Sequence, residues 1–376
     1  MLFRASFVVQ LVALQQVFAA PQQPKAAEQP KTPAQAGCTN PRIRKEWRSL
    51  TVDERKGFTT AVNCLMNKPS KFKKYYPLVE TRYDDFVALH VNETGISGQF
   101  GHPQDGQPHP GAAFNPFAHD DVHGGGSILP WHRYAIQSYE DALTEECGLK
   151  IGLPYWNWFL DSKDAGGDFV KSPLFDPVSG FGGNGKKEKN AGGFGGFGGF
   201  GFGGTGGGCI TDGPFVNRTL RIGPQGKMAV NNTRCLRRDF NPNVVDQTAN
   251  KKVLGPLLNS KTYAQFCQVI GMQLHNVGHM SVGGEMMDPF NSVNDPLFFL
   301  HHSNLDQLWA LWEEQDPKRR TDYSARQGEV FGPDSVMSLG VYGAPWTAKE
   351  LMDTQNRDGK GKLCFKYEGI PIEKYS

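Results

Sequence analysis

The sequence lacks three features that would have marked other classes of protein. Its seven cysteines include no CxxC pair, so a zinc knuckle is not indicated. Its formal net charge is only +2 over 376 residues, which gives no sign of nucleic-acid binding through bulk charge. A GKS or GKT phosphate-binding motif is also missing, although glycine is abundant. These absences leave one large domain without an indicated polyanionic partner.

A marked apolar run occurs in residues 1–20. It follows Arg4, ends in the small residues Ala19 and Ala20, and is too short and too interrupted by glutamine to span a bilayer. We expect residues 1–20 to be a signal peptide. We expect residues 21–37, which have almost no bulky apolar side chains, to be a disordered leader or pro-segment. The chain would then be secreted, without a membrane partner.

Export would also account for the cysteines. They are scattered along the chain, which favours disulfides, and their odd number leaves at least one unpaired within the chain. Cys209 and Cys235 are close enough in sequence to be a hypothesis for one bridge. Three Asn-x-Thr sequons are candidate glycosylation sites in an exported protein: Asn92, Asn217 and Asn231.

Helix signals accompany most of the histidine-bearing stretches. The expected helices cover residues 52–66, 81–90 and 127–147, with two more that begin at Thr262 and at Asp295-Pro296. The first two start with a capping box, Thr51 with Glu54 and Thr81 with Asp84. The Asp-Pro pair is typical of an N-cap followed by proline at the first helical position.

Long loops separate these helices. Residues 92–126 are rich in Gly, Pro and Asn, and a loop of this length in a compact domain is usually functional. We expect residues 180–208 to be a flexible Gly-rich insertion, because glycine at this density loses too much backbone entropy on ordering. Residues 231–245 also have the composition of a loop, and residues 335–367 mix short extended runs with Gly and Pro.

Histidine spacing indicates a metal site. His275 and His279 are four residues apart, so on a helix their imidazoles lie on one face, one turn apart. The next helix offers a third nitrogen from His301 or His302. Because adjacent helical residues point about 100° apart, we expect only one of them to join the pair.

The ten histidines fall into two groups, one at 90–132 and one at 275–302, and each can supply three imidazoles. A set without cysteine or carboxylate at the same spacing suits Cu, Zn, Ni or Fe rather than Ca or Mg. Zinc hydrolysis is the first alternative, but HNVGH lacks the glutamate of HExxH that would act as general base.

Several motifs in register now point to one family. In order and spacing they resemble the tyrosinase and catechol oxidase family of type-3 copper proteins, with the closest likeness to short secreted fungal members. The likeness covers about Cys38 to Tyr367. The motifs are FVALHV at 86–91, HGGGSILPWHRY at 123–134, PYWNW at 154–158, LHNVGH at 274–279 and NDPLFFLHHSNLDQLW at 294–309.

The resemblance implies two copper ions and six ligands. His90, His123 and His132 would hold the first copper, and His275, His279 and His302 the second. His302 is preferred to His301 because the family ligand lies seven residues after the Asp of the NDP segment, here Asp295. The loop histidines His102, His109 and His119 have no counterpart as ligands, although His119 lies close enough to His123 to be mistaken for it.

The resemblance also implies the fold and the reaction. We expect residues 38–376 to form one mainly α domain, with a four-helix-bundle core around the dinuclear copper site, long loops and few short strands. Small phenols and O2 would be its partners. Asp306, one turn after His302, is our candidate for a carboxylate that orients a ligand, and Asn276 is expected to face the mouth of the site.

Two departures from the family pattern refine the expectation. Many fungal relatives form a thioether from a cysteine that is Asp121 here, so we expect no thioether. Tyrosinases proper often carry a glutamate shortly before the first ligand of the second site, and residues 266–273 have none. This favours oxidation of o-diphenols or o-aminophenols over hydroxylation of monophenols. The alternatives are a true tyrosinase, a biosynthetic tailoring oxidase, and a non-catalytic oxygen carrier like hemocyanins.

Overall fold

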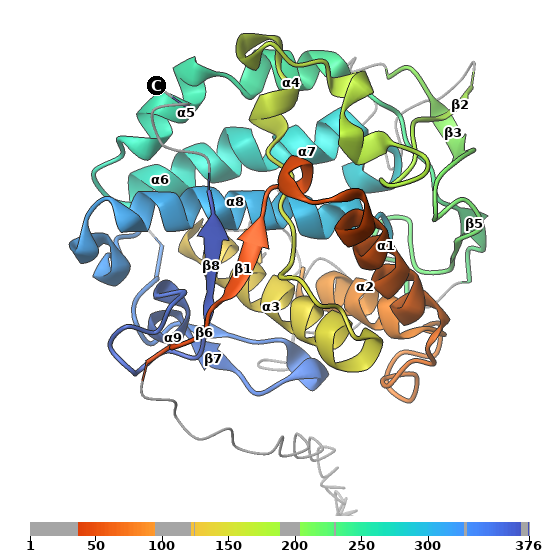
Figure 1. Cartoon of the computed structure of the whole chain (residues 1–376). Helices are drawn as coiled ribbons and strands as arrows, with labels where there is room; N and C mark the ends of the chain where they lie inside the picture. The colour runs from red at the N-terminus through yellow and green to blue at the C-terminus, as the bar shows by residue number, and fades with distance from the viewer. Residues whose placement is uncertain are drawn as a thin grey trace, which may run out of the picture.

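The computed structural model describes residues 37–94, 122–123, 125–188, 204–228, 231–326, 329–369 and 375. Helices make up its centre, and four pairs of very short strands lie around them (Figure 1). The helices are α1 (Val52–Asn67), α2 (Arg82–Glu93), α3 (Ile128–Cys147), α4 (Pro242–Thr248), α5 (Lys251–Leu258), α6 (Tyr263–Val269), α7 (His275–Val282), α8 (Leu297–Glu314) and α9 (Ala348–Met352). The strands are β1 (Arg42–Lys45), β2 (Gly185–Lys187), β3 (Gly207–Ile210), β4 (Thr219–Leu220), β5 (Arg234–Cys235), β6 (Val336–Met337), β7 (Trp346–Thr347) and β8 (Phe365–Glu368). The prediction of a mainly α fold with few short strands is confirmed.

The predicted capping boxes are present at α1 and α2. The hydroxyl of Thr51 accepts a hydrogen bond from the Glu54 N–H at 3.1 Å, and the Glu54 carboxylate accepts one from the Thr51 N–H at 2.8 Å. Thr81 and Asp84 repeat this reciprocal pair at the start of α2. A capping side chain stabilises a helix by about 1 kcal/mol, so each helix starts at a defined residue. This matters most for α2, because it carries His90.

The two other predicted helix starts are also confirmed. The hydroxyl of Thr262 accepts a hydrogen bond from the Gln265 N–H at the start of α6, and the helix continues through a π-helical turn, Ile270–Leu274, into α7. Helix α8 begins directly after Asp295-Pro296, where the Asp295 carboxylate accepts a hydrogen bond from the Leu297 N–H at 3.1 Å.

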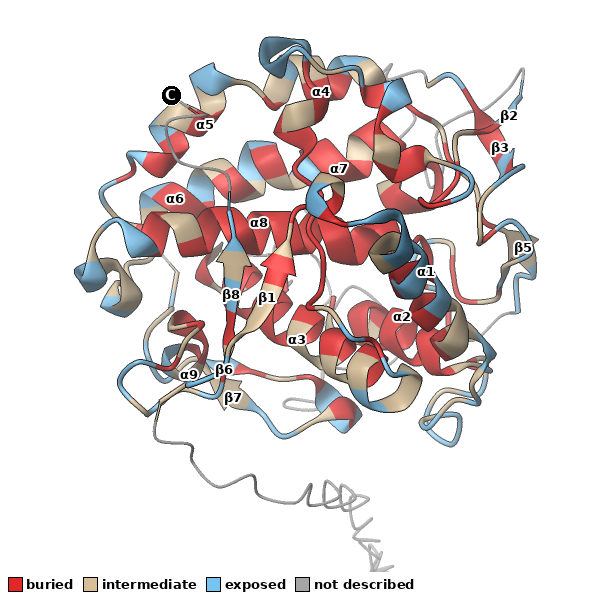
Figure 2. Ribbon diagram, in the orientation of Figure 1, coloured by how far each residue is buried: buried red, intermediate tan, exposed pale blue. Residues whose placement is uncertain are grey.

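Helix α8 lies at the middle of the core. It is buried over most of its length (Figure 2), and it packs against α3, α5 and α7. The ring of Phe299 on α8 stacks on Tyr139 of α3 with centroids 3.5 Å apart, and it meets Tyr83 of α2 edge to face. The buried residues of α8 include polar ones, among them His302 and Asp306, which must find partners inside the core. Its position lets histidines from three other helical segments reach it.

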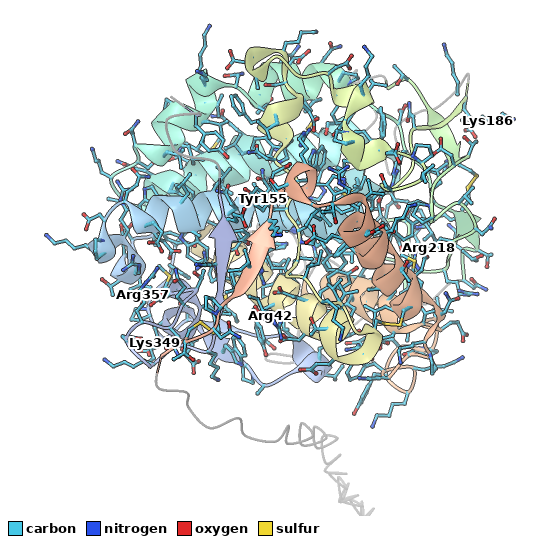
Figure 3. The ribbon with its side chains drawn as sticks, viewed as in Figure 1. Arg42, Tyr155, Lys186, Arg218, Lys349 and Arg357 are labelled. Atoms are coloured by element: carbon cyan, nitrogen blue, oxygen red, sulfur yellow. A yellow bond between two sulfur atoms is a disulfide. The ribbon has the colours of Figure 1, made fainter. Side chains whose placement is uncertain are left out.

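Pairing between the two ends of the domain is a feature that no sequence pattern indicated. Figure 1 shows β1 and β8 side by side, and they form a parallel ladder with Arg42 opposite Phe365. Arg42 and Tyr155 are labelled in Figure 3; the Tyr155 N–H donates to the Lys45 carbonyl, which extends β1 on its other side. The Cys38–Cys364 disulfide closes the same junction.

Six of the seven cysteines are paired. The predicted Cys209–Cys235 bridge is confirmed, and Cys64–Cys147 ties α1 to the end of α3. Cys267 on α6 is the unpaired cysteine, and it is buried. Within the described part of the chain, no helix has both the length and the apolar character needed to cross a membrane.

Two loop predictions need correction. The ends of the Gly-rich range 180–208 are ordered, because β2 pairs with β3 and Phe181 is fully buried against Trp47. Residues 189–203 lie outside the described residues, so a flexible insertion stays a prediction there. The predicted loop 231–245 contains β5 and the start of α4, because Pro242 occupies a helix-compatible first position. The predicted signal peptide, residues 1–20, and residues 21–36 of the predicted leader are also outside the described ranges.

Candidate metal centre

The structure brings seven histidines into two clusters. His90, His123 and His132 form one, and His275, His279, His301 and His302 form the other. Within each cluster, one ring nitrogen from every member lies within 4.8 Å of those of the others. The two groups that were separated in the sequence therefore correspond to two separate candidate metal sites.

The first cluster is assembled from three segments. His90 lies near the end of α2, His123 precedes α3, and His132 is in the second turn of α3. The ring centroids are 5.0 Å apart for His90 and His123, 5.5 Å for His123 and His132, and 5.9 Å for His90 and His132. The near-equal separations describe a triangle around one point.

The second cluster begins with the predicted pair on α7. The Nε2 atoms of His275 and His279 face each other at 3.1 Å. Two imidazole nitrogens that bind one ion at about 2.0–2.1 Å, the length of a zinc–imidazole bond, also lie about 3 Å apart. A ring nitrogen of His301 and one of His302 both lie within 4.8 Å of this pair, so proximity alone does not choose between them, and the expectation that only one joins the pair stays a prediction.

The two clusters are neighbours. The His132 ring stacks on the His302 ring at 4.0 Å with planes only 8° apart, and the His123 and His275 rings lie 5.5 Å apart. The ring of Phe298 closes the interior side, 4.2 Å from His302 and 5.1 Å from His90 between centroids. Two ions held in these clusters would therefore be close enough to act on one small molecule.

Backbone carbonyls orient the imidazoles. Nδ1 of His90 lies 2.8 Å from the Phe290 oxygen, Nδ1 of His132 lies 2.7 Å from the Ile128 oxygen, and Nδ1 of His279 lies 2.8 Å from the Met286 oxygen. Because a carbonyl only accepts, each Nδ1 must carry the proton. Each Nε2 then keeps its lone pair, which is the form that binds a metal.

Buried ring nitrogens without partners show where a ligand fits. The Nε2 atoms of His90, His132 and His302 have no hydrogen-bond partner among the described residues. Burial and the neighbouring imidazoles lower the pKa of each of these three side chains well below the usual value, and burial lowers the pKa of His279 to about 4. Neutral, desolvated imidazoles with free nitrogens fit a soft or borderline metal such as copper.

Hydrogen bonding separates His301 from His302. The His301 Nε2 donates to the His275 carbonyl at 2.8 Å, and its ring packs on Gly278, where an added Cβ would be 2.4 Å from Nδ1. His301 thus ties α8 to α7. His302 has its Nε2 free and lies against His132, between the clusters. The structure favours His302 as the ligand and gives His301 a bracing contact.

Asp306 does not have the contact that we predicted. Its carboxylate pairs with Arg133 and Arg44 and accepts a hydrogen bond from the Tyr367 hydroxyl at 2.5 Å, and none of its resolved hydrogen bonds reaches an imidazole. The spacing from His302 was right, but two buried guanidinium groups attract the carboxylate more strongly than a neutral ring does. The Met286 and Phe290 carbonyls take the orienting role, and a backbone oxygen leaves no side-chain signal in a sequence.

Several other predicted features lie at the edge of the site or outside the described residues. Asn276 is exposed beside His275, and its amide donates to the Met272 carbonyl at 3.4 Å; its place at the mouth stays a prediction. Asp121 and the loop histidines at 102, 109 and 119 are outside the described residues. Glu329, which the sequence did not single out, places its carboxylate against Gly125, close to His123 in sequence, and pairs with Arg326.

Comparisons with known proteins agree with this geometry. The chain matches the family model described as the common central domain of tyrosinase over residues 80–315, which contains both clusters. It is 32% identical to the tyrosinase-like protein phomQ2 of Diaporthe leptostromiformis, over 88% of this chain and 74% of that protein. It is also 32% identical to the N-acetyl-6-hydroxytryptophan oxidase ivoB of Emericella nidulans, over 89% of this chain and 94% of that protein.

A solved structure extends the likeness to the fold. The polyphenol oxidase of Thermothelomyces thermophila superimposes with a TM-score of 0.69 at 28% identity, over 88% of this chain and 89% of that one. The chain belongs to the tyrosinase family. It is a copper-dependent oxidoreductase of the polyphenol oxidase type, and that family implies a dinuclear copper site with which the two clusters are compatible.

Proposed function

We propose that this protein is a secreted dicopper oxidase that converts o-diphenols to o-quinones with O2, or o-aminophenols to quinone imines. The observation that carries the proposal is the contact between the two imidazole clusters, with His132 stacked on His302 at 4.0 Å. Two separate mononuclear sites would not need this contact. Oxidation of one substrate by two electrons at a metal pair would need the two sites to be adjacent.

In this proposal His90, His123 and His132 hold one copper, and His275, His279 and His302 hold the other. Free Nε2 atoms on His90, His132 and His302 support the assignment, as does the 3.1 Å approach of the His275 and His279 nitrogens. When bound, the copper pair supplies the redox chemistry between phenol and O2. Two o-diphenols each lose two electrons and two protons. One O2 takes up these four electrons and four protons and becomes two waters.

The protein's own contribution is to orient imidazoles and to direct the substrate. His90, His132, His279, His301 and His302 are buried, whereas His123 and His275 are only partly covered. The phenol therefore approaches over the edges of His123 and His275, with Asn276 exposed beside that path. Phe298 lies on the opposite, interior side and keeps water from the space between the rings.

The absence of a carboxylate in residues 266–273 supports diphenol over monophenol oxidation. Among the described residues, Glu329 lies beside Gly125, and its ion pair with Arg326 makes it a poor base. A tailoring role on one elaborate phenol is the second candidate. It is favoured by the likeness to ivoB, whose name states oxidation of N-acetyl-6-hydroxytryptophan.

Secretion is part of the proposal. It rests on the apolar segment 1–20, on the three disulfides, and on exposed sequon asparagines at 217 and 231. Expression of the full chain in a fungal host would test it. Mature protein in the medium that begins after residue 20 and loses mass on deglycosylation is expected, whereas retention inside the cell would contradict it.

The central test combines metal analysis with oxygen uptake. We expect two coppers per chain, rapid O2 consumption with a catechol, and little with the matching monophenol. Two coppers with slow turnover of every simple catechol but rapid turnover of a hydroxyindole would favour the tailoring enzyme. Oxygen uptake with a monophenol, after a lag that catechol abolishes, would favour a true tyrosinase. Fewer than two coppers would refute the ligand set.

A further inference from the structure

One loop supplies the orienting carbonyl to a histidine in each cluster. The segment 284–294 connects α7 to the start of α8 and contains two short 3-10 turns, Gly284–Met287 and Ser292–Asn294. The Met286 carbonyl near its start accepts from His279 of the second cluster, and the Phe290 carbonyl near its centre accepts from His90 of the first. The two oxygens belong to residues only four apart. Any shift of this loop must therefore move an acceptor in both clusters.

Asp288 fixes the loop between these two carbonyls. Its Oδ1 accepts from the Phe290 and Asn291 N–H groups at 3.0 and 3.1 Å, and its Oδ2 accepts from the Gln225 N–H at 2.6 Å. The side chain is 2% exposed. A buried carboxylate is retained only where hydrogen bonds satisfy it, and these three do so while they set the direction of the Phe290 peptide.

A buried ion pair fixes the start of the loop. Both oxygens of Glu285, which is 0% exposed, accept from Arg234 at 2.9 and 2.6 Å. The Arg234 guanidinium also donates to the carbonyls of Ile222 and Gly223, so it connects the loop to the segment before β5. The Asn294 amide donates to Glu285 at 3.2 Å and closes the far end of the loop onto the near one.

We propose that segment 284–294 is one positioning element for both copper sites, and that Asp288 and the Arg234–Glu285 pair hold it in place. The proposal rests on the ligand assignment in the proposed function. None of the hydrogen bonds that Asp288 and Arg234 make within the described chain goes to a histidine, so both act through the Met286 and Phe290 carbonyls. Loss of a group that orients a metal-binding imidazole typically costs about 10- to 100-fold in affinity. Here one substitution weakens two sites.

The matched pair of variants is Asp288→Asn and Asp176→Asn. Asp176 also caps a turn, by accepting from the Val178 and Ser179 N–H groups, but the hydrogen bonds of its carboxylate reach no further than Ser179. In Asp288→Asn, the side-chain NH2 group would face one of the backbone N–H groups from which the Asp288 carboxylate accepts a hydrogen bond. Stepwise copper affinity of the apoprotein, measured by competition with a chelator, is the readout, alongside the unfolding temperature.

We expect Asp288→Asn to weaken both coppers about 10-fold or more, while Asp176→Asn, at a half-buried capping carboxylate, leaves both affinities unchanged. Weakening of one copper alone, or of neither, would overturn the shared element. If Asp288→Asn does not fold, Arg234→Lys replaces it, because lysine keeps the charge and loses the bidentate fork. A folded Arg234→Lys protein with both affinities unchanged would also overturn the proposal.

The wild-type titration separates this inference from the proposed function. If the wild-type chain binds fewer than two coppers, the ligand assignment fails whatever the variants do. If it binds two, and the Asp288 variant binds them as tightly, only the positioning element fails.

Discussion

The two histidine clusters reach the same geometry by different routes. The second is built from one helix and its neighbour, with His275 and His279 one turn apart on α7 and His302 on α8. The first draws on three segments, α2, the turn before α3, and α3 itself. A pair at helical spacing is pre-formed once its helix exists, whereas three separate segments meet only when the whole core has folded. The second site is therefore local, and the first depends on tertiary structure.

The interactions that hold the two clusters in place also differ. Both clusters have imidazoles that are oriented by backbone carbonyls. A disulfide acts on a helix of the first cluster only, because Cys64–Cys147 ties α1 to the end of α3, whereas α7 and α8 of the second are joined by the hydrogen bond from His301 to the His275 carbonyl. Around the clusters, Arg133 beside His132 pairs with Asp306, one turn beyond His302, and so connects α3 to α8. Removing one of these interactions should therefore affect copper binding at the two sites unequally.

Removing one ligand from each cluster should have the largest effect. We expect His279→Ala and His132→Ala each to lose one copper equivalent and to bring phenol oxidation to background, since turnover needs both ions. Metal analysis of purified protein measures the first effect and oxygen uptake the second. His109→Ala is the control and should change neither. Two coppers retained in His279→Ala would contradict the assignment of the second site.

The adjacent histidines on α8 allow a sharper comparison within one site. His302→Gln should lose the second copper, because its Nε2 is a proposed ligand. His301→Gln should keep two coppers with at most about 10-fold weaker binding of the second, because only the brace to the His275 carbonyl is changed. Chelator competition on both variants provides the measurement. The reverse order of affinities would transfer the ligand role to His301.

How far the sequence could predict the molecule follows the same division between local and long-range features. Capping boxes at Thr51 and Thr81, the helix starts near Thr262 and Asp295, and the HxxxH pair are local patterns, and the structure has all of them. The parallel pairing of β1 with β8 joins residues more than 300 positions apart, and nothing in either strand encodes the partner. Asp306 was predicted from spacing alone, and Arg133 and Arg44, distant in sequence, determine its contact. Family motifs supplied the first cluster, which periodicity could not.

Loss of the α1–α3 disulfide should have a smaller effect that is confined to one side. Replacing both Cys64 and Cys147 by serine removes an 83-residue cross-link, which typically costs about 2–5 kcal/mol of unfolding free energy. We expect a lower unfolding temperature and weaker binding of the first copper, with the second nearly unchanged. Calorimetry and stepwise copper titration measure these effects. Equal weakening of both sites would show that the disulfide acts on the whole core.

The smallest predicted effect is a change in pH dependence at the network that joins the two sites. Burial raises the pKa of Glu313 to about 8, although Arg133 partly offsets it. Because the folded value lies above the unfolded one, this group's stabilising contribution is complete below about pH 4.5 and is lost as the pH rises through 8. The unfolding temperature of Glu313→Gln minus that of the wild type should therefore be a few degrees larger at pH 9 than at pH 6. The same difference in unfolding temperature at both pH values would refute this.

The bridge between Cys38 and Cys364 makes nearly the entire domain a covalent ring. A protease that nicks the backbone once at any point between them leaves two pieces that remain attached. Such a nicked chain would migrate as one band on a gel without reductant and as two bands with it. An oxidase built this way could sustain a single cut in a surface loop and still carry all six proposed ligands in one molecule.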